Sequence, residues 1–292
     1  MKIAFYLDKI NTYTHTPGIW GDEIYADALL KGFRKNYPEH QFYKFGNNLG
    51  FIPDEVDIAI YFQYPKKPFG KKNIYVQQNY RLEPELQAKI LKPYFDLKQD
   101  KDNKIATISN KFAKQYGWEL LLPAVDTDVF YPVKFKQEHN FDVAYIGNNI
   151  KDETKTNQYL GVPAVKYGVF GNGFNRPITP KDSLSVYNSS YINLNFVMCP
   201  ELDVLICRPY QIAGCKGFIL SEWTESLEKN FGETIEYVRP GQHPSLRIKE
   251  VLASIKANPN KAKEQREQAY KIVKEKYNCE VQAKKLWEWI NE

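Results

Sequence analysis

Short apolar runs alternate with amphipathic segments in the first half of the chain. The apolar runs predict strands at Ile3–Leu7, Gln41–Phe45, Val56–Phe62, Asn73–Gln77, Lys104–Ser109 and Glu119–Leu122. Between them, apolar residues recur at helical spacing in Asp22–Asn36 and Glu85–Leu97. This alternation is typical of a parallel sheet that is covered by helices on both faces.

The same alternation restarts after a segment, Pro123–Asn140, that has few periodic apolar residues. The strands predicted after it are Phe141–Gly147, Val165–Phe170, Tyr191–Phe196, Gly217–Leu220 and Thr234–Val238. The predicted helices are Pro180–Tyr187, Arg208–Ala213, Trp223–Phe231, Ser245–Ala257, Pro259–Tyr277 and Glu280–Asn291. We therefore expect an α/β fold of two doubly wound, Rossmann-like lobes, whose ligands bind in the cleft between them.

The expected division places residues 1–132 in the first lobe and residues 133–277 in the second. Residues 278–292 form a last helix, with Val281, Leu286, Trp287 and Ile290 largely on one face. This helix either caps the second lobe or crosses back to the first.

Composition and charge narrow the class of protein. Aromatic residues make up 15% of the chain, which argues against disorder. No apolar run approaches the roughly 20 residues that a membrane span needs. The first apolar run meets Asp8 where a secretory signal would continue, so we expect a cytoplasmic protein. A net charge of +5 permits a polyanionic partner without requiring one.

Metal and dinucleotide sites are not expected. The four cysteines form no Cys-x-x-Cys pair, and the four histidines are scattered along the chain. No Gly-x-Gly-x-x-Gly motif follows the first predicted strand, which disfavours a dinucleotide dehydrogenase. We expect neither a metal ion nor a resident cofactor.

Several segments, in order, resemble the GT-B glycosyltransferases of the "group 1" superfamily. Leu121–Pro132 resembles the interdomain signature, although Ala124 replaces the usual glycine. Phe141–Asn148 resembles the first strand and glycine turn of the second lobe. Tyr187–Asn195 and Arg208–Leu220 are similar to the CgeB-like branch. The resemblance implies a GT-B fold and sugar transfer from a nucleotide-diphosphate sugar, with UDP favoured.

A fainter resemblance connects both lobes to the DNA β-glucosyltransferases of T-even phages. It rests on Gly21–Tyr25, Asn73–Leu82 and Ile206–Leu220. It implies 5-hydroxymethylcytosine in phage-type DNA as the acceptor, and the host cytoplasm as the location. Two alternatives stay open: an acceptor on a cell-envelope glycan, lipid or protein, and a module that binds nucleotide sugars without catalysis.

The GT-B resemblance places the donor diphosphate at Arg208. Negative charge builds on this leaving group as the glycosidic bond breaks, and a guanidinium can hold two of its oxygens. The alternative is a surface arginine paired with Asp203 or Glu201. Gln211, and Asp203 eight residues before it, occupy the two positions of the family's Glu-x7-Glu pattern, both altered. Asp203 serves either the donor sugar or the capping of a loop.

Other donor contacts are expected on the loops of the second lobe. Gly147, Gly171 and Gly173 follow predicted strands, where a missing side chain lets backbone amides approach a phosphate or base. Ordinary turns are the alternative. By resemblance, Arg176 and Ile178 lie beside the nucleobase.

The acceptor is assigned to the first lobe. Trp20 lies in a glycine-bearing loop, and Asp22 or Glu23 after it would orient the acceptor or act as base. Helix capping is the alternative role for Asp22. Asn79, which cannot take a proton, stands where the phage enzyme has its catalytic aspartate, and Arg81 follows.

A proline-broken stretch supplies four further candidate acceptor contacts. Its lysines are Lys66, Lys67, Lys71 and Lys72. On a loop after a strand they would suit a phosphate-bearing acceptor, and solvated loop lysines are the alternative.

Overall fold

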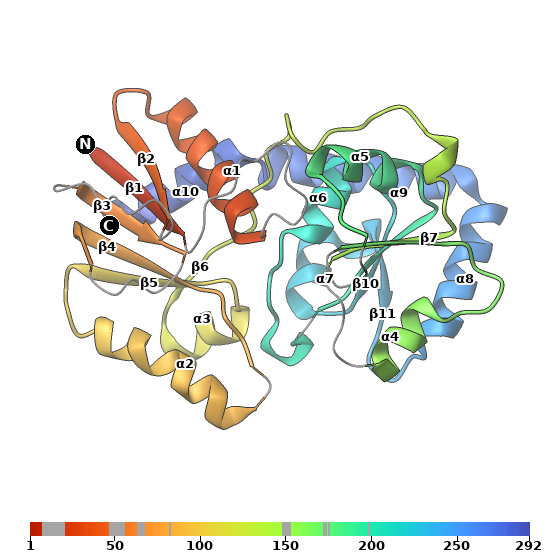
Figure 1. Cartoon of the computed structure of the whole chain (residues 1–292), viewed down its shortest axis with the longest axis horizontal. Helices are drawn as coiled ribbons and strands as arrows, with labels where there is room; N and C mark the ends of the chain where they lie inside the picture. Colours follow the sequence, from red (N-terminus) through yellow and green to blue (C-terminus); the bar gives the residue numbers. More distant parts are fainter. Residues whose placement is uncertain are drawn as a thin grey trace.

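Two parallel sheets lie side by side in a computed structural model (Figure 1). The structure describes residues 1–7, 21–46, 56–62, 68–81, 83–147, 153–171, 174, 176–197 and 199–292. The first sheet has the order β2-β1-β3-β4-β5-β6. Its strands are β1 (Lys2–Leu7), β2 (Gln41–Gly46), β3 (Val56–Tyr61), β4 (Gly70–Gln77), β5 (Asn103–Thr107) and β6 (Glu119–Leu120). The two-lobe expectation from the sequence is confirmed.

Helices cover both faces of the first sheet. They are α1 (Gly21–Asn36), α2 (Pro84–Leu97) and α3 (Asn110–Tyr116). On one face, α1 packs Leu29 and Phe33 against Ile3 and Phe5 of β1 in a common apolar core. On the other face, α2 and α3 pack against the stacked side chains of β3 and β4. The alternating apolar pattern of the sequence thus serves a sheet that is buried on both sides.

The second sheet has the order β11-β10-β9-β7-β8. Its strands are β7 (Val143–Ile146), β8 (Tyr167–Phe170), β9 (Ile192–Asn195), β10 (Ile219–Glu222) and β11 (Glu236–Val238). Its helices are α4 (Glu153–Leu160), α5 (Pro180–Ser189), α6 (Arg208–Gly214), α7 (Glu225–Phe231), α8 (Pro244–Ala257) and α9 (Pro259–Lys276). Short 3-10 turns occur at Gln137–His139, Pro200–Leu202 and Gly232–Thr234.

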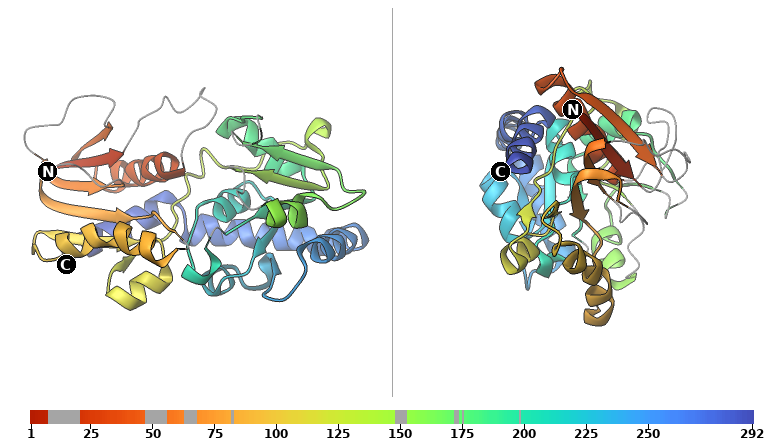
Figure 2. Two further views of the ribbon diagram at one scale, coloured as in Figure 1. Left: turned by 60° about the horizontal axis from the view of Figure 1, so that its bottom comes forward. Right: turned by 90° about the vertical axis from the view of Figure 1, so that its left-hand side faces the viewer.

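The last helix, α10 (Cys279–Asn291), leaves the second lobe and packs on the first. It lies along α1, so that the C-terminus sits beside the first sheet (Figures 1 and 2). Ala283, Leu286 and Ile290 are buried in the core that α1 covers. A side chain at Gly32 of α1 would collide with the backbone oxygen of Cys279, so this glycine permits the close approach of the two helices.

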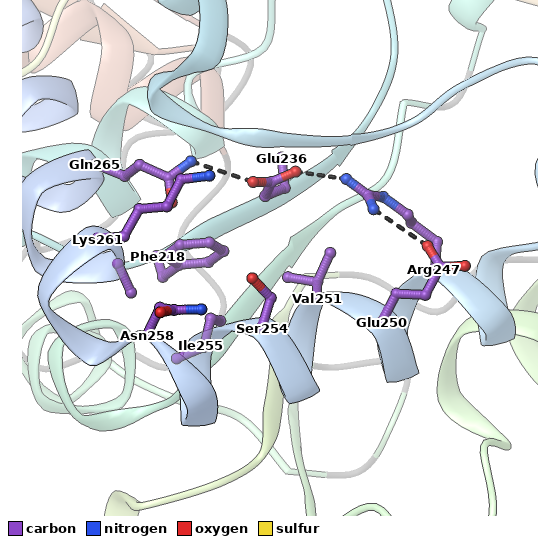
Figure 3. Close-up of a pocket in the computed structure, with 11 residues that line it drawn as sticks. Phe218, Glu236, Arg247, Glu250, Val251, Ser254, Ile255, Asn258, Lys261 and Gln265 are labelled. Atoms are coloured by element: carbon purple, nitrogen blue, oxygen red, sulfur yellow. Dashed lines mark hydrogen bonds and ion pairs between the residues drawn. The ribbon is translucent and has the colours of Figure 1, made fainter.

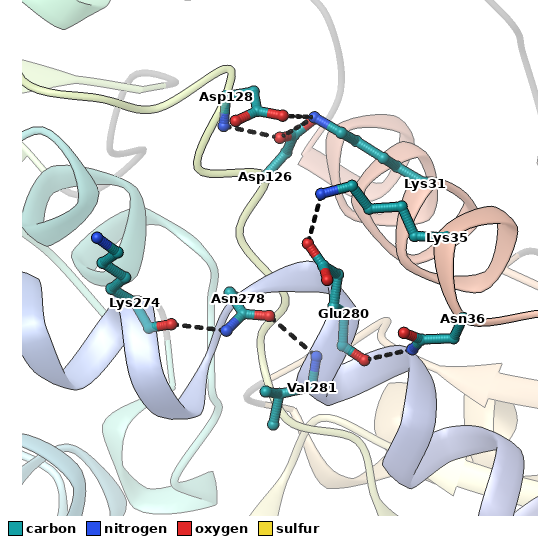
Figure 4. A network of polar contacts seen from close by, with 9 residues as sticks. All are labelled: Lys31, Lys35, Asn36, Asp126, Asp128, Lys274, Asn278, Glu280 and Val281. Carbon is teal, nitrogen blue, oxygen red and sulfur yellow. Dashed lines mark hydrogen bonds and ion pairs between the residues drawn. The ribbon is translucent and has the colours of Figure 1, made fainter.

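Polar contacts fix the crossing point (Figure 4). The Val125 N–H donates to the Tyr277 oxygen at 2.8 Å, and the Cys279 N–H donates to the Val125 oxygen at 2.9 Å. Lys31 of α1 pairs with Asp126 and Asp128 of the connecting segment, at 2.6 Å each. The chain therefore crosses between the lobes twice, and the two crossings are bonded to each other.

Two short helices and the bounds of several strands differ from the sequence expectation. Helices α3 and α4 were not predicted, because each is short and offers too few apolar residues for a clear helical period. Strand β4 begins at Gly70 rather than Asn73, so Lys71 and Lys72 belong to a strand.

None of the described helices combines the length and apolar character that a membrane crossing would require.

Candidate active site

Helix α6 has two partly exposed side chains, and its other residues are buried. Of its residues, Arg208 and Gln211 are half-buried and the others are buried. The helix begins where the lobes meet, because Cys207, just before it, packs against the core of the first lobe. Tyr210, one turn inside, is fully buried in the second lobe. Arg208 and Gln211 are three residues apart and so share one face of the helix.

Arg208 is held in place without a partner for its charge. Its guanidinium carbon lies 5.1 Å from the ring centre of Tyr145, in β7. Within the described part of the chain, no carboxylate or hydrogen-bond acceptor contacts it. The pairing with Asp203 or Glu201 that the sequence left open is therefore not formed. Arg208 presents a positioned cation, and Gln211 an amide that likewise has no partner among the described residues.

Two glycines make room for this cation. A β-carbon at Gly147 would lie 2.7 Å from a terminal nitrogen of Arg208 and 2.7 Å from the Tyr145 hydroxyl. Gly171 has a φ of 136° and approaches Gly147 so closely that a side chain would collide with its carbonyl oxygen. These glycines follow β7 and β8, so the site lies at the carboxyl edge of the second sheet. The structure brings Arg208, Gly147 and Gly171 together, as the donor site predicted from the sequence requires.

The carboxylate of Asp203 is hydrogen-bonded to other residues of the protein, so it is not available to bind a donor sugar. Its carboxylate accepts hydrogen bonds from the Ser226 N–H (3.1 Å), the Ser226 hydroxyl (2.6 Å) and the Asn110 side chain (2.8 Å). The residue is 8% exposed and joins α3 of the first lobe to α7 of the second. Of the two roles that the sequence left open, this geometry supports the capping role, because both carboxylate oxygens are already engaged.

The remaining donor-side candidates lie after β8. The Arg176 guanidinium stacks 4.2 Å from the ring centre of Phe170, and its backbone N–H donates to the Gly171 oxygen at 3.3 Å. Ile178 packs against the small core that contains Phe170. Gly173 lies outside the described residues.

The start of α1 lies at the same junction. Ile24 packs against the core of the second lobe, and the Tyr25 hydroxyl donates to the Leu122 oxygen at 2.6 Å. Asp22 is half-buried in the first turn, where its carboxylate accepts from the Glu23 N–H at 3.0 Å. Glu23 is fully buried and pairs with Lys44 at 3.2 Å. A buried, paired carboxylate is poorly placed to take a proton from an acceptor, so this geometry favours Asp22 over Glu23.

The other acceptor-side candidates separate into two groups. Asn79 and Arg81 are exposed just beyond the carboxyl end of β4. Lys71 and Lys72 lie at the amino end of the same strand, where Lys71 pairs with Asp57 at 3.1 Å and Lys72 donates to the Ile290 oxygen. The prediction that these two lysines form a loop for the acceptor is wrong, because they belong to the opposite edge of the sheet.

Trp20, Lys66 and Lys67 lie outside the described residues. Among the residues that the structure describes, no three histidine, cysteine or acidic side chains form a group that could hold a metal ion. Sequence reasoning missed Tyr145; its signal is an aromatic residue two positions before the glycine that follows β7.

A cavity of the second lobe lies away from the candidate donor residues. A cavity of about 280 Å³ lies between α8, α9 and the amino ends of β10 and β11 (Figure 3). Its one strand carboxylate, Glu236, pairs with Arg247 at 2.5 Å and accepts a hydrogen bond from the Gln265 side chain at 3.2 Å. This cavity is on the opposite edge of the sheet from Arg208.

Comparison with solved structures identifies the fold. An α-glucosyltransferase in complex with UDP-glucose and DNA containing an abasic site superposes with a TM-score of 0.68 at 11% identity, covering 100% of both chains. AviGT4, a glycosyltransferase of avilamycin A biosynthesis, gives 0.67 at 12% identity over 99% of this chain and 97% of its own. HepE from Anabaena, in complex with UDP-glucose, gives 0.63 at 11% over 100% and 99%. These likenesses confirm the GT-B architecture expected from the sequence.

Comparison of sequences identifies the family. No curated protein matches this sequence. A family model described as "Glycosyl transferase-like" matches residues 141–288, which is half of the chain and contains Gly147, Gly171 and Arg208. The matched segment therefore includes all of the described candidates for donor binding. The chain belongs to the glycosyl transferase-like family and is a glycosyltransferase with a GT-B fold.

Proposed function

We propose that this glycosyltransferase takes its sugar from a UDP-sugar and that Arg208 binds the donor diphosphate. The observation that carries the proposal is a positioned guanidinium with no anionic partner among the described residues. It stands at a glycine-lined edge where a phosphate can approach the backbone. Solved structures with the same fold hold UDP-glucose, which supports uridine as the nucleoside.

The chemistry follows from where the charge develops. As the bond between the sugar and the diphosphate breaks, the leaving group gains negative charge. Arg208 would stabilise this charge, and it is already in position before the donor binds. Gln211, one turn along the same face, would accept a hydrogen bond from a ribose hydroxyl or donate one to it. Asp22, at the facing start of α1, would orient the acceptor hydroxyl.

For the acceptor, we propose the hydroxymethyl group of 5-hydroxymethylcytosine in DNA. Two structures of the same fold are α-glucosyltransferases in complex with DNA, and the chain covers their full length or nearly so. The net charge of +5 is compatible with a polyanion. Exposed Arg81, beyond the carboxyl end of β4, is the described basic residue that is placed for a phosphate contact.

The donor proposal is tested by calorimetric titration of UDP and GDP into the wild type and Arg208→Ala. We expect UDP to bind more tightly than GDP. The substitution should weaken UDP binding by about 1.5–3 kcal/mol, because a charged hydrogen bond is lost. Arg247→Ala is the matched control, since it removes an arginine of the same lobe from the opposite cavity. Equal losses in both variants would contradict the assignment.

The acceptor proposal is tested by transfer of labelled glucose from UDP-glucose to duplexes that carry 5-hydroxymethylcytosine or cytosine. We expect label only in the hydroxymethylated duplex. Its incorporation should fall steeply with added salt, because phosphate contacts release counterions. Hydrolysis of UDP-glucose without any labelled DNA, at all salt concentrations, would rule out this acceptor and leave the donor proposal standing.

A further inference from the structure

The ring of Tyr145, in β7, is held by other aromatic side chains of the second lobe. Its centre lies 4.4 Å from that of Phe196 and 6.0 Å from that of Phe174. The Phe196 ring lies in turn 4.5 Å from that of Tyr159 in α4. Tyr145 is 4% exposed and shares one apolar core with Phe196 and Tyr159. The fold therefore sets the position of this ring without a ligand.

Arg208 lies against the Tyr145 ring at the carboxyl edge of the second sheet. The distance of 5.1 Å from its guanidinium carbon to the ring centre is within the range of about 6 Å for a cation–π interaction. A β-carbon at Gly147 would lie 2.7 Å from a terminal nitrogen of Arg208 and 2.7 Å from the Tyr145 hydroxyl. The two side chains thus meet beside this glycine, which leaves room for their contact.

Other arginines of the second lobe are held through their N–H groups. The Arg247 guanidinium pairs with Glu236 at 2.5 Å, and the Arg266 guanidinium donates to the Ser190 oxygen at 3.2 Å. An aromatic face orients a guanidinium without occupying its N–H groups, whereas a carboxylate occupies them and offsets the charge. Contact with a ring therefore fixes Arg208 and keeps its donors available to an anion.

We propose that Tyr145 is a positioning residue for the donor diphosphate, because its ring face holds the Arg208 guanidinium where that group binds the phosphates. This assignment rests on the proposed function, since it assumes that Arg208 binds the diphosphate. A side chain that is in place before the ligand arrives loses less rotamer freedom on binding. Loss of the ring should therefore weaken UDP binding through Arg208 and leave the other contacts of the nucleotide unchanged.

The first test separates the ring of Tyr145 from its hydroxyl, by calorimetric titration of UDP. Tyr145→Leu should weaken UDP binding about fivefold or more, because the cation–π interaction is lost. Tyr145→Phe keeps the ring and should stay within about twofold of the wild type. Tyr159→Leu is the matched control, since its ring belongs to the same core and packs on Phe196. It should lower the melting temperature as Tyr145→Leu does and leave UDP affinity unchanged.

The second test measures the coupling between Tyr145 and Arg208 in a double-mutant cycle. In the Arg208→Ala background, Tyr145→Leu should cause no further loss of UDP affinity. A ring with a merely structural role would lower the affinity equally in both backgrounds. If Tyr145→Leu melts below the assay temperature, Tyr145→Met takes its place in both tests, because it fills space without an aromatic face.

Three results would reject the positioning role and keep the proposed function. They are equal losses in the two backgrounds, a loss in Tyr145→Phe as large as that in Tyr145→Leu, and unchanged affinity in Tyr145→Leu when Arg208→Ala does bind UDP more weakly. If the wild type binds no UDP, or if Arg208→Ala binds it as the wild type does, the proposed function fails and the positioning role fails with it.

Discussion

Two charged residues of this protein, five positions apart, have different surroundings although the sequence suggested a role in donor binding for both. The guanidinium of Arg208, at the edge of the second sheet, has no anionic partner among the described residues. Both carboxylate oxygens of Asp203 accept hydrogen bonds, from Ser226 of its own lobe and from Asn110 of the first lobe. Both stand at positions that family resemblance connects to the donor. What separates them is the set of neighbours that the fold brings to each, Ser226 and Asn110 in one case and an aromatic face in the other.

We expect Asp203→Ala to destabilise the protein by about 2–3 kcal/mol, because it leaves the polar groups of Ser226 and Asn110 without their buried acceptor. Urea unfolding measures this loss. Exposed Glu201, two residues earlier, is the control, and its alanine variant should stay within about 0.5 kcal/mol of the wild type.

The same variants separate the two roles of Asp203. In the folded fraction of Asp203→Ala, UDP should bind as in the wild type. A large loss of UDP affinity with little loss of stability would show instead that Asp203 contacts the donor.

The site could be predicted from the sequence only where local chain geometry decides the outcome. Arg208 and Gln211 share a face because three positions are one helical turn. Gly147 and Gly171 were found because glycine after a strand marks a close backbone approach. The burial of Glu23 against Lys44 could not be predicted in this way, because that contact joins α1 to β2 and depends on tertiary packing.

At the scale of elements, the strongly periodic helices were predicted closely, whereas the short helices α3 and α4 were not predicted. The observed bounds of α1, α2, α8 and α9 differ from the predicted ones by a residue or so. Helix α3 depends on Ser109, whose hydroxyl accepts from the Phe112 N–H, and on the left-handed Gly117 that ends it. Such capping contacts stabilise a seven-residue helix without an apolar period.

Helix α10 is the element whose energetic role is tested most directly. Leu286 is 4% exposed in the core of the first lobe. We expect Leu286→Ala to cost about 2–5 kcal/mol in the free energy of unfolding, measured in urea, because it leaves a cavity between α10 and α1. Leu246→Ala on α8 makes the same chemical change at a position that is 61% exposed, and it should be nearly neutral. Similar small effects in both variants would contradict the packing of α10.

At the scale of the molecule, two separate junctions hold the lobes together. At one, the segment around Val125 is bonded to the segment between α9 and α10. At the other, Leu205 and Asp203 of the second lobe are bonded to Ile108 and Asn110 of the first. The sequence alone could not decide whether the last helix crosses back, since its apolar face would fit either lobe.

We expect the two lobes to unfold in a single transition because each junction joins them through backbone hydrogen bonds. In Trp223→Phe, the other described tryptophans, Trp118, Trp287 and Trp289, lie on the first-lobe side. Their fluorescence and the far-ultraviolet circular dichroism of the whole chain should then give coincident urea curves. Two separated midpoints would show that the lobes unfold independently.

The return of α10 also sets the order in which the protein can be completed during synthesis. All strands of the first sheet have been made by residue 120, but the apolar strip of α1 waits for Ala283, Leu286 and Ile290. A ribosome that adds about 5–20 residues per second needs roughly 10–30 s to make the segment between them. During that time the nascent first lobe carries an uncovered apolar surface, which makes it a natural client for chaperones until the last helix emerges.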